Sequence, residues 1–338
     1  MANPTGDRWH DTPTALYGGI AMAAGVAAAA VFLLYSGFSN TWFWLGAAII
    51  STLGFIDDRF HLSPSVRVLV EVLAAVLVVI GGFGISGSPV LAGLITVMWI
   101  VLVSNAINLI DGADGVASSV VGVTSLIAGL LLLNFGNTEV ALIAFVLSAV
   151  SFGFLTYNFP PAKIFMGDGG SLLLGFLLAV VSLEVGRSLS ENSSLFQLAV
   201  AFSFVAVPFL DAVFVALVRI LVGSNPAHGG THHIHHRLRL AGLSPIQTTV
   251  GLATLAAVFA LTARIATSQP SLFIAIGCFA VMALVLLELL LVQQTGFLPS
   301  KDGETAERRS LIRAGKWLKT ISPWPKVVAD GVILGTSF

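Results

Sequence analysis

The sequence predicts an all-α, polytopic integral membrane protein, and two observations lead to this fold class. Of the 338 residues, 56% are hydrophobic and 10% are charged, with a mean hydropathy of +0.95, which is more apolar material than a soluble core of this size can bury. The apolar residues also form ten runs of about the length that a membrane-spanning helix needs. The expected spans are residues 15–36, 41–56, 66–85, 89–104, 114–134, 138–157, 169–186, 194–219, 246–267 and 271–292.

Four clusters of polar residues interrupt the apolar chain, and they follow the second, fourth, sixth and eighth runs. The clusters are Asp57-Asp58, residues 105–114, residues 158–171 and residues 228–239. Because successive spans cross the bilayer in opposite directions, all four clusters emerge on the same face. The pattern therefore predicts one site that the four clusters share.

Basic residues indicate which face this is, since Lys and Arg are retained in cytoplasmic loops. With the amino terminus inside, only Arg187 and Arg264 of the sixteen Lys and Arg lie on the outer side. We therefore expect a multi-pass protein of the inner or plasma membrane, with the site and both termini in the cytoplasm. The net charge of −1 gives no indication of a nucleic-acid partner.

The chain divides into a membrane domain, residues 1–292, and a basic tail, residues 293–338. Basic and apolar residues alternate in the tail at near-helical spacing, which predicts a helix lying on anionic lipid headgroups. A disordered basic tail is the alternative. Cys278 lies in an apolar run. Because it is the single cysteine of the sequence, no intramolecular disulfide can form.

In the first cluster, Asp57 and Asp58 are adjacent, and adjacent helix positions point about 100° apart. We therefore expect the two carboxylates to do different work. One would face the site, while the other would cap a helix or pair with Arg59. A solvated helix end is the plainer alternative.

The second cluster repeats an oxygen-bearing side chain every three residues, at Asn105, Asn108, Asp111 and Asp114. The first three share one helix face. Oxygen donors suit a hard cation such as Mg²⁺, which takes one or two protein ligands and leaves room for phosphate and water. A polar helix end with an Asx turn is the alternative reading.

The third cluster joins the sixth and seventh spans, and its glycines allow backbone to approach a ligand closely. The start of the seventh helix is a natural phosphate site. Asp168 at that start would normally be the N-cap, and an acidic group beside phosphate makes sense if a cation bridges the two. Phe165 is either a packing residue or an aromatic plate for a planar base.

The fourth cluster carries His232, His235 and His236 at the spacing i, i+3, i+4, which alone would indicate zinc. Arg237 and Arg239 lie beside them, and the other clusters offer hard oxygen ligands. His with Arg is typical of a phosphate or pyrophosphate site, so we favour a clamp for a polyanion.

Four acidic residues lie inside the predicted spans, where an ionised carboxylate is costly and indicates a function. They are Glu71, Glu184, Asp211 and Glu288. Asp211 either lines the floor of the site or locks helices together by hydrogen bonding.

These motifs resemble those of the polyprenyl-phosphate N-acetylhexosamine-1-phosphate transferase superfamily. GFIDDR, NAINLIDGADG, NFPPAKIFMGDGGS and the His-His-Arg-Leu ending of THHIHHRL occur in the family's order and spacing, over essentially the whole chain. The resemblance implies an enzyme that moves a HexNAc 1-phosphate from a UDP-sugar to a polyprenyl phosphate, releases UMP and starts a cell-envelope glycan. The His-rich segment resembles the branch that starts O-antigen and teichoic acid, which implies UDP-GlcNAc and undecaprenyl phosphate.

The resemblance also implies roles for single residues. Asp57 would lie near the lipid phosphate, Asn108 and Asp168 would bind Mg²⁺ (with Mn²⁺ as an alternative ion), and Asp111 and Asp114 would lie toward the nucleotide. The residues expected to act in catalysis are Asp57, Asp58, Asp111, Asp114 and Asp168. Those expected to bind substrate are Asn105, Phe165 at the uracil ring, His233, His235, His236 and Arg237.

The implied acceptor is a phosphate monoester with a second pKa of about 6, so it is a good nucleophile at neutral pH. The difficulty is to bring two anions together, which a cation and a positive clamp solve. We expect direct attack on the UDP diphosphate, with Asp57 orienting or deprotonating the lipid phosphate. Phospho-N-acetylmuramoyl-pentapeptide transferase is the runner-up. A transporter would instead gather acidic groups near the midplane. Membrane lipids are expected contacts, and a homodimer is compatible with the sequence.

Overall fold

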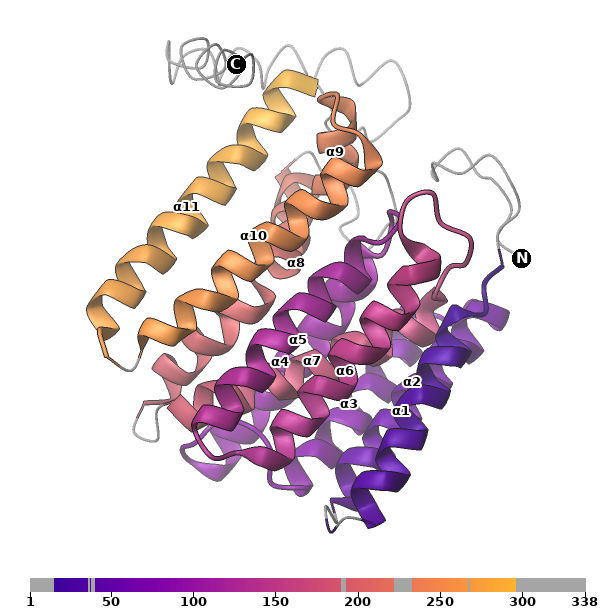
Figure 1. The fold of residues 1–338 in the computed structure, drawn as a ribbon, viewed down its shortest axis with the longest axis vertical. Coiled ribbons are helices and arrows are strands. Elements are labelled where there is room, and N and C mark those ends of the chain that lie inside the picture. The colour runs from indigo at the N-terminus through magenta and orange to yellow at the C-terminus, as the bar shows by residue number, and fades with distance from the viewer. Residues whose placement is uncertain are drawn as a thin grey trace.

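The computed structural model describes residues 15–35, 37, 40–189, 193–221, 233–266 and 268–295, and the regular elements in these ranges are helices (Figure 1). One isolated bridge joins Ala15 to Ile164. The helices are α1 (Gly18–Tyr35), α2 (Thr41–Phe60), α3 (Pro64–Ile80), α4 (Pro89–Ile110), α5 (Val116–Asn134), α6 (Thr138–Asn158), α7 (Gly167–Leu189), α8 (Ser194–Leu221), α9 (Ile234–Leu240), α10 (Pro245–Ala266) and α11 (Pro270–Thr295).

Each of the ten predicted spans corresponds to one long helix, and α9 is an additional short helix inside the fourth cluster. Among the described residues, eight helices are long and apolar enough to cross a membrane. The two that fall short are α2, which ends in Asp57, Asp58 and Arg59, and α3, which has 17 residues and contains Arg67 and Glu71. The chain is therefore an all-α, multi-pass membrane protein, and the two long helices that fall short are ones that carry charged residues.

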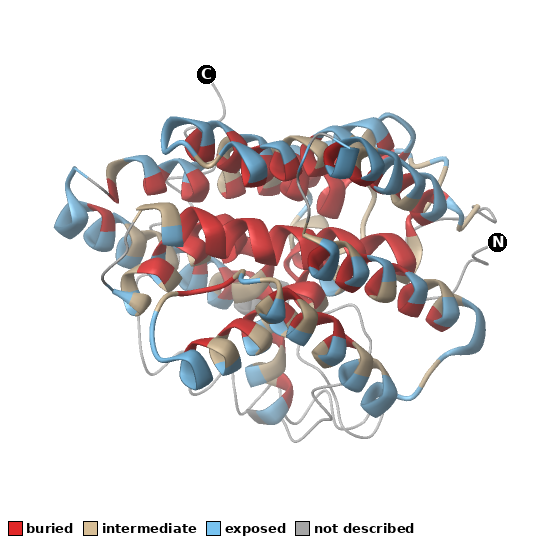
Figure 2. Cartoon of the chain, turned by 90° about the horizontal axis from the view of Figure 1, so that it is seen from below, coloured by how far each residue is buried: buried red, intermediate tan, exposed pale blue. Residues whose placement is uncertain are grey.

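Helix α7 is the centre of the bundle. It packs against α1, α2, α4, α5, α6 and α8, and its residues from Gly169 to Gly186 are buried. Figure 2 shows this helix as a continuous buried core surrounded by helices that expose their outer sides. A helix that is apolar on every side suits a position inside a protein core or against lipid, and α7 lies in the core.

Glycines allow the neighbouring helices to approach the beginning of α7 closely. A Cβ atom on Gly54 of α2 would lie 2.4 Å from the carbonyl oxygen of Asp168, and one on Gly19 of α1 would lie 2.6 Å from the backbone nitrogen of Gly170. Only a residue without a side chain fits at such distances. The helices α1, α2 and α7 therefore meet around Asp168 and Gly170 of the third cluster.

Helices α8, α10 and α11 form the other side of the bundle, and α9 lies at one end of them (Figure 1). Helix α9 contacts both α10 and α11. The predicted tail lies almost entirely outside the described residues, as do His228 and His232 of the fourth cluster.

Candidate active site

The four polar clusters meet at one end of the bundle, as predicted from their alternation. Asp58 of the first cluster bonds to the third, Asn108 of the second bonds to Asp168 of the third, and Gly112 of the second abuts His235 of the fourth. These contacts join segments that lie far apart in the sequence. The site is therefore built from helix ends and the links between them.

Asp57 and Asp58 have different partners, as expected from their adjacent positions on the helix. The Asp57 carboxylate accepts a hydrogen bond from the Leu62 backbone N–H at 2.7 Å and pairs with the Arg67 guanidinium at 2.9 Å. The Asp58 carboxylate accepts the backbone N–H groups of Asp168, at 2.9 Å, and Gly169, at 3.2 Å. Asp58 of α2 thus caps the amino-terminal end of α7.

Asp168, which stands where an aspartate would normally be the N-cap, does not cap the seventh helix. Helix α7 begins at Gly167, whose φ of 66° is a left-handed value that favours glycine, and Asp168 lies in the first turn. Because a carboxylate from another helix satisfies the exposed N–H groups, the Asp168 side chain is free for other contacts.

Asp168 contacts a ring of polar groups from three helices. Its Oδ1 accepts a hydrogen bond from the Asn108 amide at 2.9 Å, and its Oδ2 lies 3.4 Å from the Arg67 guanidinium. The same Asn108 amide donates to the Ser171 hydroxyl at 2.9 Å. The Asp168 side chain keeps 32% of its surface exposed. The Asp168 carboxylate therefore faces accessible space beside the Arg67 cation and the Asn108 amide group.

The sequence analysis did not identify Arg67, although it pairs with both Asp57 and Asp168. A signal was present in the sequence. Arg67 is a basic residue at the start of an apolar run, and only the short link of residues 61–63 separates that run from the helix carrying Asp57-Asp58. Two consecutive antiparallel helices joined by so short a link bring such residues together.

Asn105 lies one turn deeper than Asn108, and its amide is engaged by the neighbouring helix. It donates to the Glu71 carboxylate at 2.5 Å and to the Val101 carbonyl at 2.9 Å. Glu71 is 1% exposed, and its second oxygen has no hydrogen-bond partner within the described part of the chain. The pair joins α3 to α4 beneath the site, and a substrate-binding role for Asn105 stays a prediction.

Asp114 and Asn158 hold the two loops of the site together. The Asp114 carboxylate accepts the Ala162 backbone N–H at 2.9 Å. The Asn158 side chain accepts the Gly115 N–H at 2.9 Å and donates to the Ile164 carbonyl at 2.8 Å. The α4–α5 link and the α6–α7 link therefore form one unit. Asp111 ends α4 next to this unit and is partly buried.

The backbone of Phe165 is fixed by the segment that enters α1. Its N–H donates to the Ala15 carbonyl at 2.9 Å, and its own carbonyl accepts the Gly18 N–H at 3.0 Å. The residue is partly buried. The structure thus gives Phe165 a defined position beside Asp168, and the choice between packing and base stacking stays open.

The described part of the fourth cluster is buried against acidic residues. His233 Nδ1 lies 2.7 Å from the Asp211 carboxylate, which also accepts the Ile234 backbone N–H at 2.7 Å. The Arg237 guanidinium lies 2.6 Å from the Glu288 carboxylate and 3.5 Å from that of Asp211. Of the two readings of Asp211, helix locking is therefore the one that the contacts support.

His235 has no exposed surface, and its neighbours His236 and Arg237 are nearly as buried, at 4% and 1%. A Cβ atom on Gly112 would lie 2.8 Å from its Nε2, and its ring is parallel to that of His233 at 5.8 Å. Burial, followed by the charges of His236, His233 and Arg237, holds the pKa of His235 well below its usual value of 6.5. The ring is therefore neutral and packs against the α4–α5 link, and a substrate-binding role for His235 stays a prediction.

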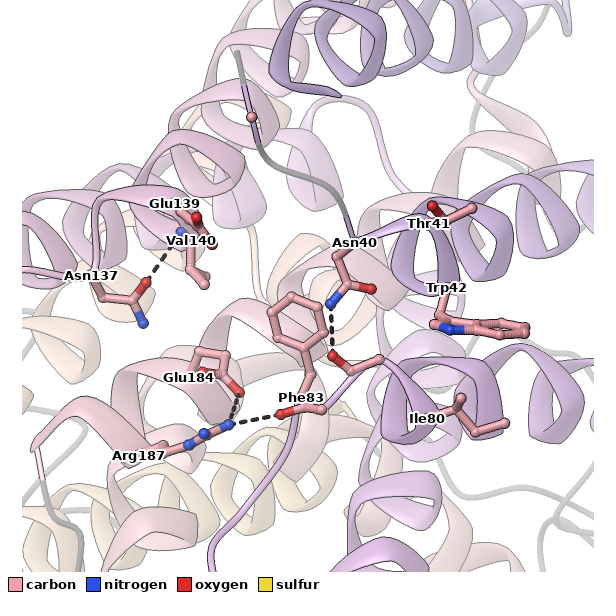
Figure 3. Close-up of a pocket in the computed structure, with 13 residues that line it drawn as sticks. Asn40, Thr41, Trp42, Ile80, Phe83, Asn137, Glu139, Val140, Glu184 and Arg187 are labelled. Carbon is pink, nitrogen blue, oxygen red and sulfur yellow. Dashed lines mark hydrogen bonds and ion pairs between the residues drawn. The ribbon is translucent and has the colours of Figure 1, made fainter. Parts of the chain in front are cut away.

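A pocket of about 480 Å³ lies at the opposite end of the bundle, between the first residues of α2 and α6 and the last residues of α3 and α7 (Figure 3). Several of its polar groups are already paired with one another. The Asn40 amide donates to the Gly81 carbonyl at 2.7 Å, and the Arg187 guanidinium donates to the Gly82 carbonyl at 2.8 Å and lies 3.4 Å from Glu184. The reactive groups lie at the other end, so we place the candidate active site there.

Comparison with known proteins is consistent with this geometry. The model of the family described as glycosyl transferase family 4 matches residues 40–186, which include Asp57, Asn108 and Asp168. The probable undecaprenyl-phosphate N-acetylglucosaminyl 1-phosphate transferase of Bacillus subtilis is 32% identical over 312 residues, covering 88% of this chain and 85% of the relative. The chain belongs to glycosyl transferase family 4.

Other relatives of this family 4 chain carry similar names. The decaprenyl-phosphate N-acetylglucosaminephosphotransferase of Mycobacterium leprae is 35% identical over 276 residues, covering 70% of this chain and 69% of the relative. The undecaprenyl-phosphate alpha-N-acetylglucosaminyl 1-phosphate transferase of Escherichia coli K12 is 28% identical over 258 residues, covering 72% and 69%. Membership of this family makes the chain a transferase, in agreement with the resemblance seen in its motifs.

Proposed function

We propose that this protein transfers GlcNAc 1-phosphate from UDP-GlcNAc to undecaprenyl phosphate and releases UMP. Its relatives are named for GlcNAc 1-phosphate transfer to a polyprenyl phosphate. In the molecule, the observation that supports the proposal most is the convergence of Asp57, Arg67, Asn108 and Asp168 at one end of the bundle. This set combines hard oxygen ligands with a fixed cation, which is what a reaction between two phosphates requires.

The residues present fit a magnesium ion, with Mn²⁺ as an alternative. Among the described residues, no three His, Cys, Asp or Glu side chains converge so as to hold a metal. Mg²⁺ needs only one or two protein ligands when phosphate and water complete its shell. Asn108 and Asp168 would hold it, because the two side chains are adjacent and the Asp168 carboxylate is partly exposed. The Asn108 amide, whose nitrogen donates to Asp168 here, would turn its oxygen toward the ion. When bound, the ion would cancel charge on the donor diphosphate.

The Asp57–Arg67 pair supports a role for these two residues at the lipid phosphate. The guanidinium supplies a positive charge beside the Asp57 carboxylate, at 2.9 Å. We propose that Arg67 binds the acceptor phosphate and that Asp57 orients it or removes its last proton. An acceptor oxygen then bonds to the phosphorus that carries the sugar, the bond from that phosphorus to the bridging oxygen breaks, and UMP leaves with the bridging oxygen.

The remaining residues support this step. Asp58 acts through its cap on α7, which fixes the backbone that carries Asp168. Asp111 and Asp114 would lie toward the nucleotide, with Phe165 against the uracil ring and with His233, His236 and Arg237 toward the phosphates. From the distribution of Lys and Arg, we propose that this end of the bundle faces the cytoplasm, together with both termini.

A panel of donors tests the proposal. The purified full-length protein is supplied with undecaprenyl phosphate and, in turn, with UDP-GlcNAc, UDP-GalNAc and UDP-N-acetylmuramoyl-pentapeptide, and UMP release is measured with Mg²⁺ or with EDTA. We expect release from UDP-GlcNAc that requires both the lipid and the metal. Preference for the muramoyl donor, or equal release when water replaces the lipid, would contradict the proposal.

A further inference from the structure

Two acidic residues in long apolar helices have no role in the chemistry described so far. Asp211 lies in α8 and Glu288 in α11, and each is 1% exposed. A carboxylate in such a helix is costly unless it is paired, and it therefore indicates a specific partner. For both residues that partner lies in or directly before α9, the helix of the fourth cluster.

Asp211 fixes the beginning of α9 through two contacts. One carboxylate oxygen accepts the Ile234 N–H and the other lies on His233 Nδ1, both at 2.7 Å. A carboxylate at Nδ1 keeps the proton on that nitrogen and sets the plane of the ring. The nitrogen left to meet a ligand is Nε2. The contact therefore determines both the tautomer and the direction of the His233 side chain.

Glu288 fixes the next turn of α9 through Arg237. The ion pair is 2.6 Å long, and the guanidinium also lies over the ring of Phe214 at 4.8 Å. The Nε atom of Arg237 is buried without a hydrogen-bond partner among the described residues, so the pair leaves a donor unused. Helices α8 and α11 thus hold one side of α9 by two separate carboxylates.

The other side of α9 reaches the candidate active site. His235 and His236 lie against Gly112 in the link between α4 and α5, the segment that also carries Asp111 and Asp114. Because His235 is fully buried there, a shift of α9 must be accompanied by a shift of this link. The position of α9 is therefore coupled to the loop expected to contact the nucleotide.

We propose that Asp211 and Glu288 are positioning residues of the active site. Asp211 orients His233 so that Nε2 meets the diphosphate of the donor. Glu288 holds Arg237, and therefore α9, in the position in which both side chains can contact that diphosphate. This inference rests on the proposed function, because the diphosphate is the ligand that His233 and Arg237 would share. Neither Asp211 nor Glu288 touches the substrate; each acts through a residue of the fourth cluster.

A double-mutant cycle in the full-length protein tests the inference. UDP-GlcNAc affinity is measured by calorimetry, and kcat/KM by UMP release, for the wild type, Asp211→Asn, His233→Gln and the double variant. Loss of one charge-assisted contact predicts about a tenfold or greater decrease for each single variant. If Asp211 acts through His233, the double variant is within about threefold of His233→Gln alone. The proposal would be overturned if the decrease in the double variant equalled the product of the two single decreases, or if Asp211→Asn behaved like the wild type.

Glu184 provides a matched control. It is also a buried acid, 4% exposed, and it accepts a backbone N–H from Gly84 at 3.0 Å and pairs with an arginine, but it lies at the far end of α7. Glu184→Gln should lower thermal stability while UDP-GlcNAc affinity and kcat/KM stay within about twofold of the wild type. An equal loss in this variant would show that any buried carboxylate matters in the same way, and would overturn a specific role for Asp211.

Glu288→Gln gives an independent measurement, which also serves if Asp211→Asn does not fold. We expect a KM for UDP-GlcNAc raised about fivefold or more, with the KM for undecaprenyl phosphate within twofold, since α9 faces the donor side of the site. A change in the lipid KM alone would overturn the assignment. If the wild type releases no UMP, the proposed function fails, whereas UDP binding to the same variants still decides the roles of Asp211 and Glu288.

Discussion

Arg67 joins the two carboxylates that the reaction is proposed to use, so its removal should be among the most informative changes. Arg67→Gln keeps much of the side chain's length and hydrogen-bonding capacity but removes the charge. The contact with Asp57, at 2.9 Å, is a close ion pair, comparable in strength to a charge-assisted hydrogen bond, with a side chain that is 5% exposed. The contact with Asp168, at 3.4 Å, is a longer ion pair with a side chain that is 32% exposed.

These distances set the expected magnitude. A charge-assisted hydrogen bond contributes about 1.5–3 kcal/mol, and a more exposed ion pair contributes about 0.2–1 kcal/mol. Together they amount to about 2–4 kcal/mol. Because the Arg67 side chain is 22% exposed, solvent screens its charge, and we expect a value in the lower half of this range. If this stabilisation is realised in the transition state, kcat/KM falls by about 30- to 100-fold.

The assay is UMP release from UDP-GlcNAc at varied undecaprenyl phosphate, with thermal unfolding in detergent as the measure of folding. Arg67→Lys should retain an intermediate activity, because an ammonium group is a point charge and does not bridge two carboxylates as a guanidinium does. If Arg67→Gln keeps kcat/KM within threefold of the wild type while it folds normally, the proposed role of the Asp57–Arg67 pair is refuted.

Three further changes test other parts of the site. Asp168→Asn should abolish Mg²⁺-dependent UMP release while the protein still folds in detergent, because Asp58 and not the Asp168 side chain caps α7; retained turnover would refute its assignment as a metal ligand. Gly112→Ala places a methyl group 2.8 Å from the buried His235 ring and should destabilise the protein by about 1–3 kcal/mol and raise the donor KM, as thermal unfolding and UMP release would show. Because the pKa of His235 is depressed in the folded state, the unfolded chain takes up this proton first as the pH falls below about 6.5, so unfolding becomes easier by up to about 1.4 kcal/mol per pH unit. The unfolding temperature of His235→Gln, measured from pH 7.5 to 5.5, should fall less than that of the wild type, and parallel curves would contradict this.

The sequence was sufficient to predict the ten long helices and the meeting of the four clusters, because both follow from hydropathy and from the alternation of spans. Helices α2 and α4 extend beyond the predicted runs, to Phe60 and Ile110. Their last turns are polar and are held by bonds to other helices, such as the bond from Asn108 to Asp168. An apolar run cannot show such an extension, because its limits reflect the bilayer and not the helix.

What the sequence could not supply is the choice of partner for each polar group. An aspartate at position 168 would normally cap its own helix, yet Asp58 performs this task from α2. Asp211 was compatible with two roles, and its partners lie directly before and in α9. In both cases a distant part of the chain decides the outcome, so no local pattern distinguishes the possibilities. Arg67 is different, because the short link between α2 and α3 already indicates that it lies near Asp57.

The cap of Asp58 on α7 has a consequence for the synthesis of the protein. The two ends of this contact are 110 residues apart in the chain, and α3 to α6 are made between them. When α2 leaves the ribosome, its carboxylates have neither the backbone amides of α7 nor the Asn108–Asp168 pair beside them. The site thus comes into being late, when α7 enters the centre of the bundle. A chain interrupted before that point contains the first aspartates but no arrangement able to act on a lipid phosphate.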